Sequence, residues 1–71
     1  MNIDMQAARA TGFNRGWDHA AYADAYGGAL NEEPREADIP QRFKNEGTDI
    51  YYTSGWIEGV DSYNEALYEA A

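Results

Sequence analysis

Four carboxylates near the end of the sequence have a type and spacing that could carry function. They are Glu58, Asp61, Glu65 and Glu69. Their intervals of three, four and four residues place them within an arc of about 80° on a helix. Neighbouring carboxylates at this spacing lie about 5–6 Å apart, which is similar to the separation of successive phosphates on a nucleic-acid strand. Such a face would mimic nucleic acid or bind a basic surface, and the alternative is an ordinary solvated helix face.

Catalytic chemistry has little support in the residue types. His19 is the only histidine, and neither Ser54 nor Ser62 has the sequence context of a nucleophile elbow. We therefore expect His19 to be a surface or partly buried helix residue, and we expect no catalytic residue. Asp18, His19 and Glu58 are a weak metal-binding signal, since one histidine with scattered carboxylates lacks a ligand pattern. We expect neither a metal nor another cofactor.

Composition and charge restrict the class of partner. The 71 residues include 13 acidic and 5 basic side chains, so the net charge is −8, and there is no cysteine. This charge opposes direct binding to nucleic acid or an anionic membrane and favours a basic protein surface. No apolar run approaches the ~18 residues of a membrane span. We expect a soluble chain in the bacterial cytoplasm that forms one small helical domain over residues 1–71.

Two helices are expected, one on each side of an irregular linker. The first spans about residues 3–26, is rich in alanine and stops at Gly27-Gly28. The linker, residues 27–48, contains both prolines, and Pro40 is a suitable start for a short helical turn through Phe43. The second helix spans about residues 49–69, with Thr48 as its N-cap. The fold class is therefore all-α, a two-helix hairpin with a long irregular linker.

Apolar residues at helical spacing predict the face that each helix buries. In the second helix the stripe comprises Tyr52, Trp56, Val60, Tyr63 and Leu67. In the first helix a shorter stripe comprises Ala10, Phe13, Trp17 and Ala20. Tyr22, Tyr26, Tyr51 and Tyr68 fall outside both stripes. Tyrosine is favoured at interfaces, so Tyr51 and Tyr68 are expected to bind the partner beside the four carboxylates. The alternative is that some of these tyrosine rings cap the small core.

The two helical segments share a repeated motif at a constant offset of 43 residues. Gly12-Phe13-Asn14-Arg15-Gly16-Trp17-Asp18 matches Gly55-Trp56-Ile57-Glu58-Gly59-Val60-Asp61. Glycines four apart form a shallow groove on one helix face. Two antiparallel helices could place each groove against the other's aromatic ring, so we predict a packing motif of Gly12, Phe13, Gly16, Trp17, Gly55, Trp56 and Gly59. The alternative is chance similarity between two short segments.

This doubled motif resembles the ribosome modulation factor family and its plasmid- and phage-borne relatives. Gly12-Phe13-Asn14-Arg15-Gly16 is similar to the motif of their first helix, and residues 52–59 are similar to that of their second. The resemblance covers about 20 residues and implies two helices joined by a linker. This chain departs from the family in its longer linker and in its acidity, since the family members that bind ribosomal RNA are strongly basic. We expect the fold to carry over, and not the RNA binding.

The function expected from these observations is that of a non-enzymatic acidic interaction protein. We expect a phage or mobile-element inhibitor that docks on a basic, nucleic-acid-binding surface of a host or defence protein. The partner-binding residues are Glu58, Asp61, Glu65, Glu69, Tyr51 and Tyr68. Alternatives are a ribosome-associated modulation factor and a self-associating structural protein, because a second copy in a homodimer could complete the aromatic stripes.

Overall fold

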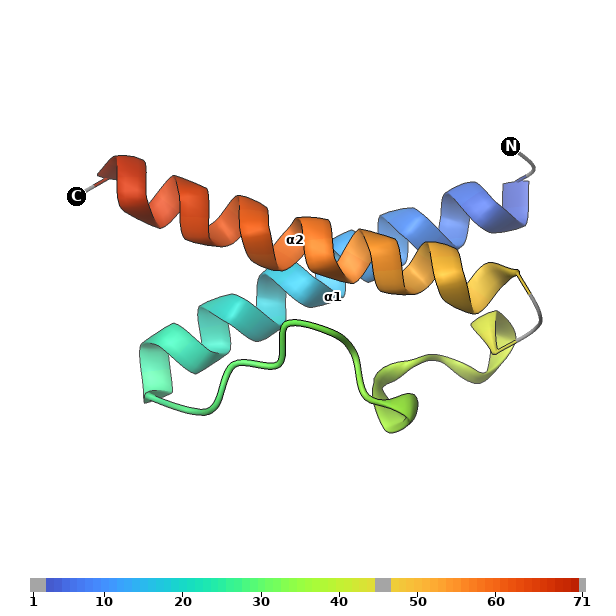
Figure 1. Ribbon diagram of the computed structural model, residues 1–71, viewed down its shortest axis with the longest axis horizontal. Helices are drawn as coiled ribbons and strands as arrows, with labels where there is room; N and C mark the ends of the chain where they lie inside the picture. Colours follow the sequence, from blue (N-terminus) through green and yellow to red (C-terminus); the bar gives the residue numbers. More distant parts are fainter. Residues whose placement is uncertain (1–2, 45–46, 71) are drawn as a thin grey trace.

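The chain consists of two long helices and an irregular linker (Figure 1). The computed structural model describes residues 3–44 and 47–70. α1 spans Ile3–Tyr26 and α2 spans Thr48–Ala70, and the linker contains two short 3₁₀ helices, η1 (Glu36–Asp38) and η2 (Gln41–Phe43). The described part of the chain contains no strand. The predicted two-helix fold with a long irregular linker is confirmed, as is the short helical turn that follows Pro40.

Glycines lie at the linker ends of both helices. Gly27 takes a left-handed conformation with φ of 69°, and the N–H of Gly28 donates to the carbonyl of Ala23 at 3.1 Å, so α1 ends where its glycine pair predicts. Gly47, with φ of 93°, precedes α2. Thr48, the expected N-cap, is the first residue of α2, and its hydroxyl donates to the carbonyl of Phe43 at 3.1 Å. The start of α2 is thereby tied to η2.

The two helices run in the same direction, whereas the glycine motif was expected to join antiparallel helices. Arg9, Phe13 and Trp17 of α1 contact Gly55, Gly59 and Tyr63 of α2 in that order. Residue numbers therefore increase in the same direction along both helices. Figure 1 shows that both helices begin on the right and end on the left. The reason is the length of the linker. α1 is about 36 Å long, and residues 27–47 can return the chain to the start of α1 before α2 begins.

The helices cross where the repeated glycines meet. A methyl group on Gly12 or Gly16 would lie within 3.0 Å of the carbonyl oxygen of Tyr52 or Trp56, respectively. The equivalent groups on Gly55 and Gly59 would meet the carbonyl oxygens of Arg9 and Phe13. Each glycine therefore faces the residue three positions before its counterpart in the other helix.

Because the contacts of each helix are repeated by the other, residues that are equivalent in the 43-residue repeat are related by a local two-fold symmetry of the parallel pair. The close approach predicted for the motif is present. The grooves face backbone, however, and not the rings of the other helix. Backbones can touch in this way only where neither helix carries a Cβ.

The core combines small residues of α1 with large ones of α2. The buried alanines of α1 are Ala8, Ala20 and Ala23. Opposite them, α2 buries Tyr52, Trp56 and Val60. The stripe predicted for the first helix is therefore wrong in part: Ala10 is exposed, and Phe13 and Trp17 are only half-buried. Small residues occupy the buried face of α1 because larger side chains would keep α1 away from the backbone of α2.

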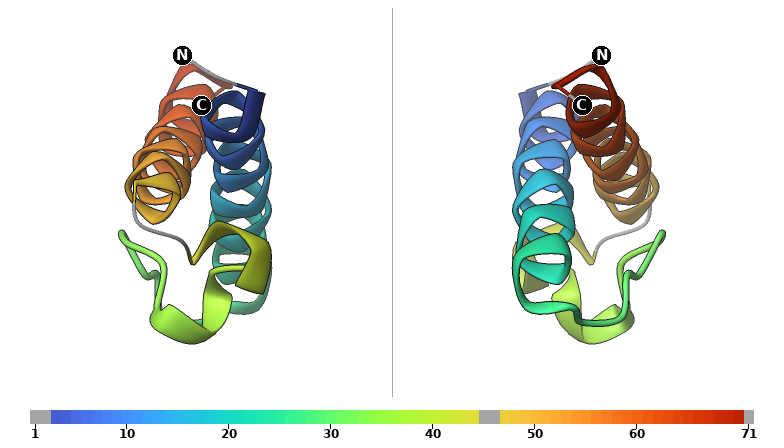
Figure 2. Two further views of the ribbon diagram at one scale, coloured as in Figure 1. Left: turned by 90° about the vertical axis from the view of Figure 1, so that its right-hand side faces the viewer. Right: turned by 90° about the vertical axis from the view of Figure 1, so that its left-hand side faces the viewer.

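The linker lies along one side of the helix pair (Figure 2). Its Phe43 is buried and stacks on Tyr52, with ring centroids 5.9 Å apart. The peptide groups of Asn31 are held from both helices, because its N–H donates to Nε2 of His19 at 2.9 Å and its carbonyl accepts from Nε1 of Trp56 at 3.0 Å. The Tyr52 hydroxyl donates to the carbonyl of Asp38 at 2.9 Å. Side chains from both helices thus fix the linker.

Candidate functional site

The end of the molecule at which both helices terminate is strongly acidic. Residues 16–30 and 59–70 contain five carboxylates and no lysine or arginine. They are Asp24, Asp61, Glu65 and Glu69, together with Asp18, which lies about two turns before the end of α1 and lines a hollow that Arg15 also lines. We call this half of the molecule the acidic end, and it carries five of the eight net negative charges. Because the helices are parallel, both of their partially negative C-termini lie at the same end and add to its potential.

One of the four predicted carboxylates lies outside this surface. Glu58 forms an ion pair with Arg9, whose Nε donates to Oε2 of Glu58 at 3.0 Å and whose Nη2 donates to the same oxygen. Glu58 therefore lies beside the crossing, with its charge opposed by a cation of α1. The expected face of four carboxylates is reduced to Asp61, Glu65 and Glu69, all of which are exposed.

The two tyrosines expected to bind the partner lie in different surroundings. Tyr68 is 88% exposed and lines a shallow hollow of about 510 Å³ with Asp61, Asn64 and Glu65. Tyr51 is half-buried against the core. Seventeen residues of helix separate them, which corresponds to about 25 Å. Tyr68 therefore belongs to the acidic end, and Tyr51 does not.

A second hollow, lined mostly by apolar residues and glycine, lies at the acidic end. We call it the apolar groove, and its volume is about 210 Å³. It is lined by Ala20, Ala23, Asp24, Gly28, Leu30, Asn64 and Leu67. Asn64 lines both this groove and the hollow beside Tyr68, so the two surfaces adjoin. Leu67, expected on the buried stripe, is 46% exposed, so the stripe is not covered at this position.

A hydrogen bond between the helices positions one carboxylate at the groove. The hydroxyl of Tyr63 donates to Oδ2 of Asp24 at 2.9 Å. This hydrogen bond raises the pKa of the Tyr63 hydroxyl above its usual range, because ionisation would place two negative charges together. The side chain of Asp24 on α1 is thereby oriented toward α2. Sequence reasoning missed Asp24, and the available signal was the absence of lysine and arginine from residues 16–34.

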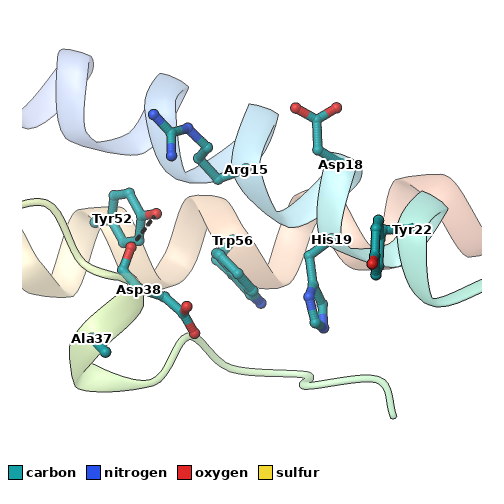
Figure 3. Close-up of a pocket in the computed structure, with 8 residues that line it drawn as sticks. All are labelled: Arg15, Asp18, His19, Tyr22, Ala37, Asp38, Tyr52 and Trp56. Carbon is teal, nitrogen blue, oxygen red and sulfur yellow. Dashed lines mark hydrogen bonds between the residues drawn. The ribbon is translucent and has the colours of Figure 1, made fainter. Parts of the chain in front are cut away.

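A third hollow lies beneath the linker, and Figure 3 shows its lining residues. Its volume is about 370 Å³, and it is lined by Arg15, Asp18, His19, Tyr22, Ala37, Asp38, Tyr52 and Trp56. The Nε2 lone pair of His19 accepts the Asn31 N–H, and its ring lies 5.2 Å from that of Trp56. His19 is therefore the partly buried helix residue expected from the sequence, and it holds the linker. Burial raises the pKa of the Tyr52 hydroxyl in the same hollow.

Residues 3–44 and 47–70, which the structure describes, contain neither a metal-binding cluster nor a membrane-spanning helix. In this part of the chain, no three His, Cys, Asp or Glu side chains gather closely enough to hold a metal ion. Neither α1 nor α2, as described, combines the length and the apolar character needed to cross a bilayer. Comparison of the chain with protein-family models, with curated proteins and with solved structures finds no match.

Proposed function

We propose that this chain is a non-enzymatic interaction protein that docks its acidic end on a basic, nucleic-acid-binding surface of another protein. The observation that carries the proposal is that the exposed carboxylates Asp24, Asp61, Glu65 and Glu69 lie toward the ends of two parallel helices, in stretches of sequence without lysine or arginine. Basic surfaces that bind nucleic acid offer the complementary charge. The setting that we propose, from the sequence resemblance, is a phage or mobile element that inhibits a bacterial host or defence protein.

The exposed carboxylates of α2 support mimicry of nucleic acid over simple solubility. Asp61, Glu65 and Glu69 follow one another at intervals of four residues, so each is the helical neighbour of the next. Like charges at this spacing destabilise a helix by about 0.2–0.5 kcal/mol per pair, and no cation of α2 relieves them. Glu58, by contrast, has its cation in Arg9. A surface that retains unrelieved repulsion is suited to a partner that supplies the missing cations.

Capture of the partner with matched charge variants tests this proposal. The variant D61N/E65Q/E69Q neutralises the acidic surface of α2, and E32Q/E33Q/E36Q neutralises three exposed carboxylates of the linker. Both variants change the net charge equally. Immobilised wild-type protein should retain a bacterial protein at low salt and release it at high salt or on addition of duplex DNA. The first variant should lose at least about tenfold in affinity for that protein, whereas the linker variant should not.

Three results would contradict the proposal. The first is equal loss in both variants, because general charge would then account for binding. The second is a captured protein that duplex DNA does not displace, because its nucleic-acid site would then be free. Retention on intact ribosomes with the same salt dependence would favour the ribosome-associated alternative instead.

A further inference from the structure

The apolar groove is the feature of the acidic end that the proposed function does not use. Its floor and walls come from the C-terminal halves of α1 and α2 and from the first linker residues. Its volume of about 210 Å³ is below the ~300–1,000 Å³ typical of small-molecule sites. A groove of this size suits one or two side chains of a larger partner.

The exposed leucines of the groove indicate that it lacks an apolar covering within the described chain. Leu67 continues the apolar stripe of α2 by one further turn. The two helices diverge toward their C-terminal ends (Figure 1). Leu67 is 46% exposed and Leu30 is 40% exposed. Both line the groove together with Ala20 and Ala23, whose side chains are buried. An incoming aliphatic side chain would remove this leucine surface from water.

One carboxylate lines the groove itself, and two more line the hollow beside it. Asp24 lines the groove on α1 and is oriented by its hydrogen bond from Tyr63. On α2, Asn64 joins the groove to the hollow that Asp61 and Glu65 line. Residues 16–34 and 47–70 contain no lysine or arginine. The groove therefore combines an apolar floor with one lining carboxylate, and the adjoining hollow adds two further carboxylates and no cation.

We propose that this groove binds a cationic amphipathic helix of the partner protein, with an aliphatic side chain between Leu30 and Leu67 and its lysines or arginines beside Asp24, Asp61 and Glu65. This inference rests on the proposed function and names the part of the partner that is recognised. Apolar anchors at helical spacing are the usual means by which a helix enters a groove. A second copy of this chain is a poor occupant, because it would bring two acidic ends together.

Two synthetic peptides and two protein variants test the groove directly. One peptide carries leucine at i, i+3, i+4 and i+7 with lysine elsewhere, and the other replaces each leucine with glutamine at unchanged charge. L67S removes a groove wall, and I50S is its matched control, because Ile50 is an apolar residue, 65% exposed, near the other end of α2. Titration followed by amide NMR spectra reports both the affinity and the residues that respond.

The leucine peptide should bind wild-type protein at least about fivefold more tightly than the glutamine peptide, with shifts at Ala23, Leu30 and Leu67. L67S should remove this preference, and I50S should retain it. Equal binding of both peptides, or equal behaviour of L67S and I50S, overturns the groove as a binding site. If D61N/E65Q/E69Q still weakens capture of the partner in that case, the proposed function stands without the groove. If L67S alone weakens that capture, the groove stands and the charge mimicry fails.

Discussion

The absence of a Cβ atom at four positions allows the two helices of this protein to cross in contact. The four repeated glycines touch the backbone of the opposite helix, and each would place a Cβ within 3.0 Å of a carbonyl oxygen. Glycine inside a helix costs about 1 kcal/mol relative to alanine. The structure retains four such residues because they permit the crossing from which the core of Tyr52, Trp56 and Val60 is built.

Substitution of a crossing glycine should therefore destabilise the fold, although alanine favours helices. We expect G12A and G59A each to lower the free energy of unfolding by about 1–3 kcal/mol, because the backbones must separate to admit the methyl group. G28A is the matched control, since its nearest neighbour, the Cα of Ala23, would lie 4.0 Å away. Urea unfolding followed by circular dichroism measures all three, and equal stabilities would contradict the crossing geometry.

At the scale of elements, the linker behaves as a third structural layer and not as a loose connection. His19 and Trp56 hold both peptide groups of Asn31, and Tyr52 holds the carbonyl of Asp38. Arg35 closes the turn around η1, because its backbone N–H and its Nε donate to Oδ2 of Asp38 at 3.0 and 3.1 Å. This attachment keeps the start of α2 beside the start of α1.

The turn at η1 should give the protein a specific sensitivity to acid. The hydrogen bond from the Arg35 side chain lowers the pKa of the Asp38 carboxyl below its ordinary value of 3.8. Because the pKa is lower in the folded state, the contribution to stability is present above the ordinary value. It is lost as the pH falls through the lowered pKa. The Arg35 side chain is largely exposed, so water screens the pair and its contribution to stability is small.

The variant D38N isolates this effect from the other carboxylates. The difference in unfolding midpoint between wild type and D38N should be largest near neutral pH and should vanish in strong acid. The difference between the two proteins reports on Asp38 because every other acidic residue is present in both. A constant difference across the acid range would show that the Asp38 charge has no part in stabilising the turn.

At the scale of the whole molecule, charge is unevenly distributed between the acidic end and the remainder of the chain. The acidic end carries five carboxylates and no basic side chain, and all five basic residues lie in the remainder of the chain. Parallel helices also align their dipoles, so their partially negative termini coincide with the carboxylates. Repulsion at this end opposes folding, and a basic partner would relieve it.

Neutralising the acidic end should thus raise stability while weakening partner binding. We expect D61N/E65Q/E69Q to increase the free energy of unfolding by about 0.5–1 kcal/mol at low salt, since two like-charged pairs are removed. The gain should shrink near 1 M salt, where the Debye length is about 3 Å. Thermal unfolding at both salt concentrations measures this, and a stability loss at low salt would argue that these carboxylates have stabilising partners.

Local patterns in the sequence determined most of the helical structure. The glycine pair after Tyr26, the period of residues 52–63 and Pro40 before η2 are local signals, and each corresponds to a feature of the fold. They were readable because helix propensity, periodicity and capping act over a few residues. The 43-residue repeat also indicated correctly which glycines would allow close approach.

Only the tertiary structure decided the direction of α2 relative to α1. Glycines four apart form the same groove in parallel and antiparallel pairs, so periodicity carries no information about direction. The linker, held by His19, Trp56 and Tyr52, makes the pair parallel. This direction pairs Glu58 with Arg9, leaves Leu67 exposed and brings Asp24 to the hydroxyl of Tyr63. The sequence by itself determined an acidic helical protein, and the long-range return of the chain determined where its charges gather.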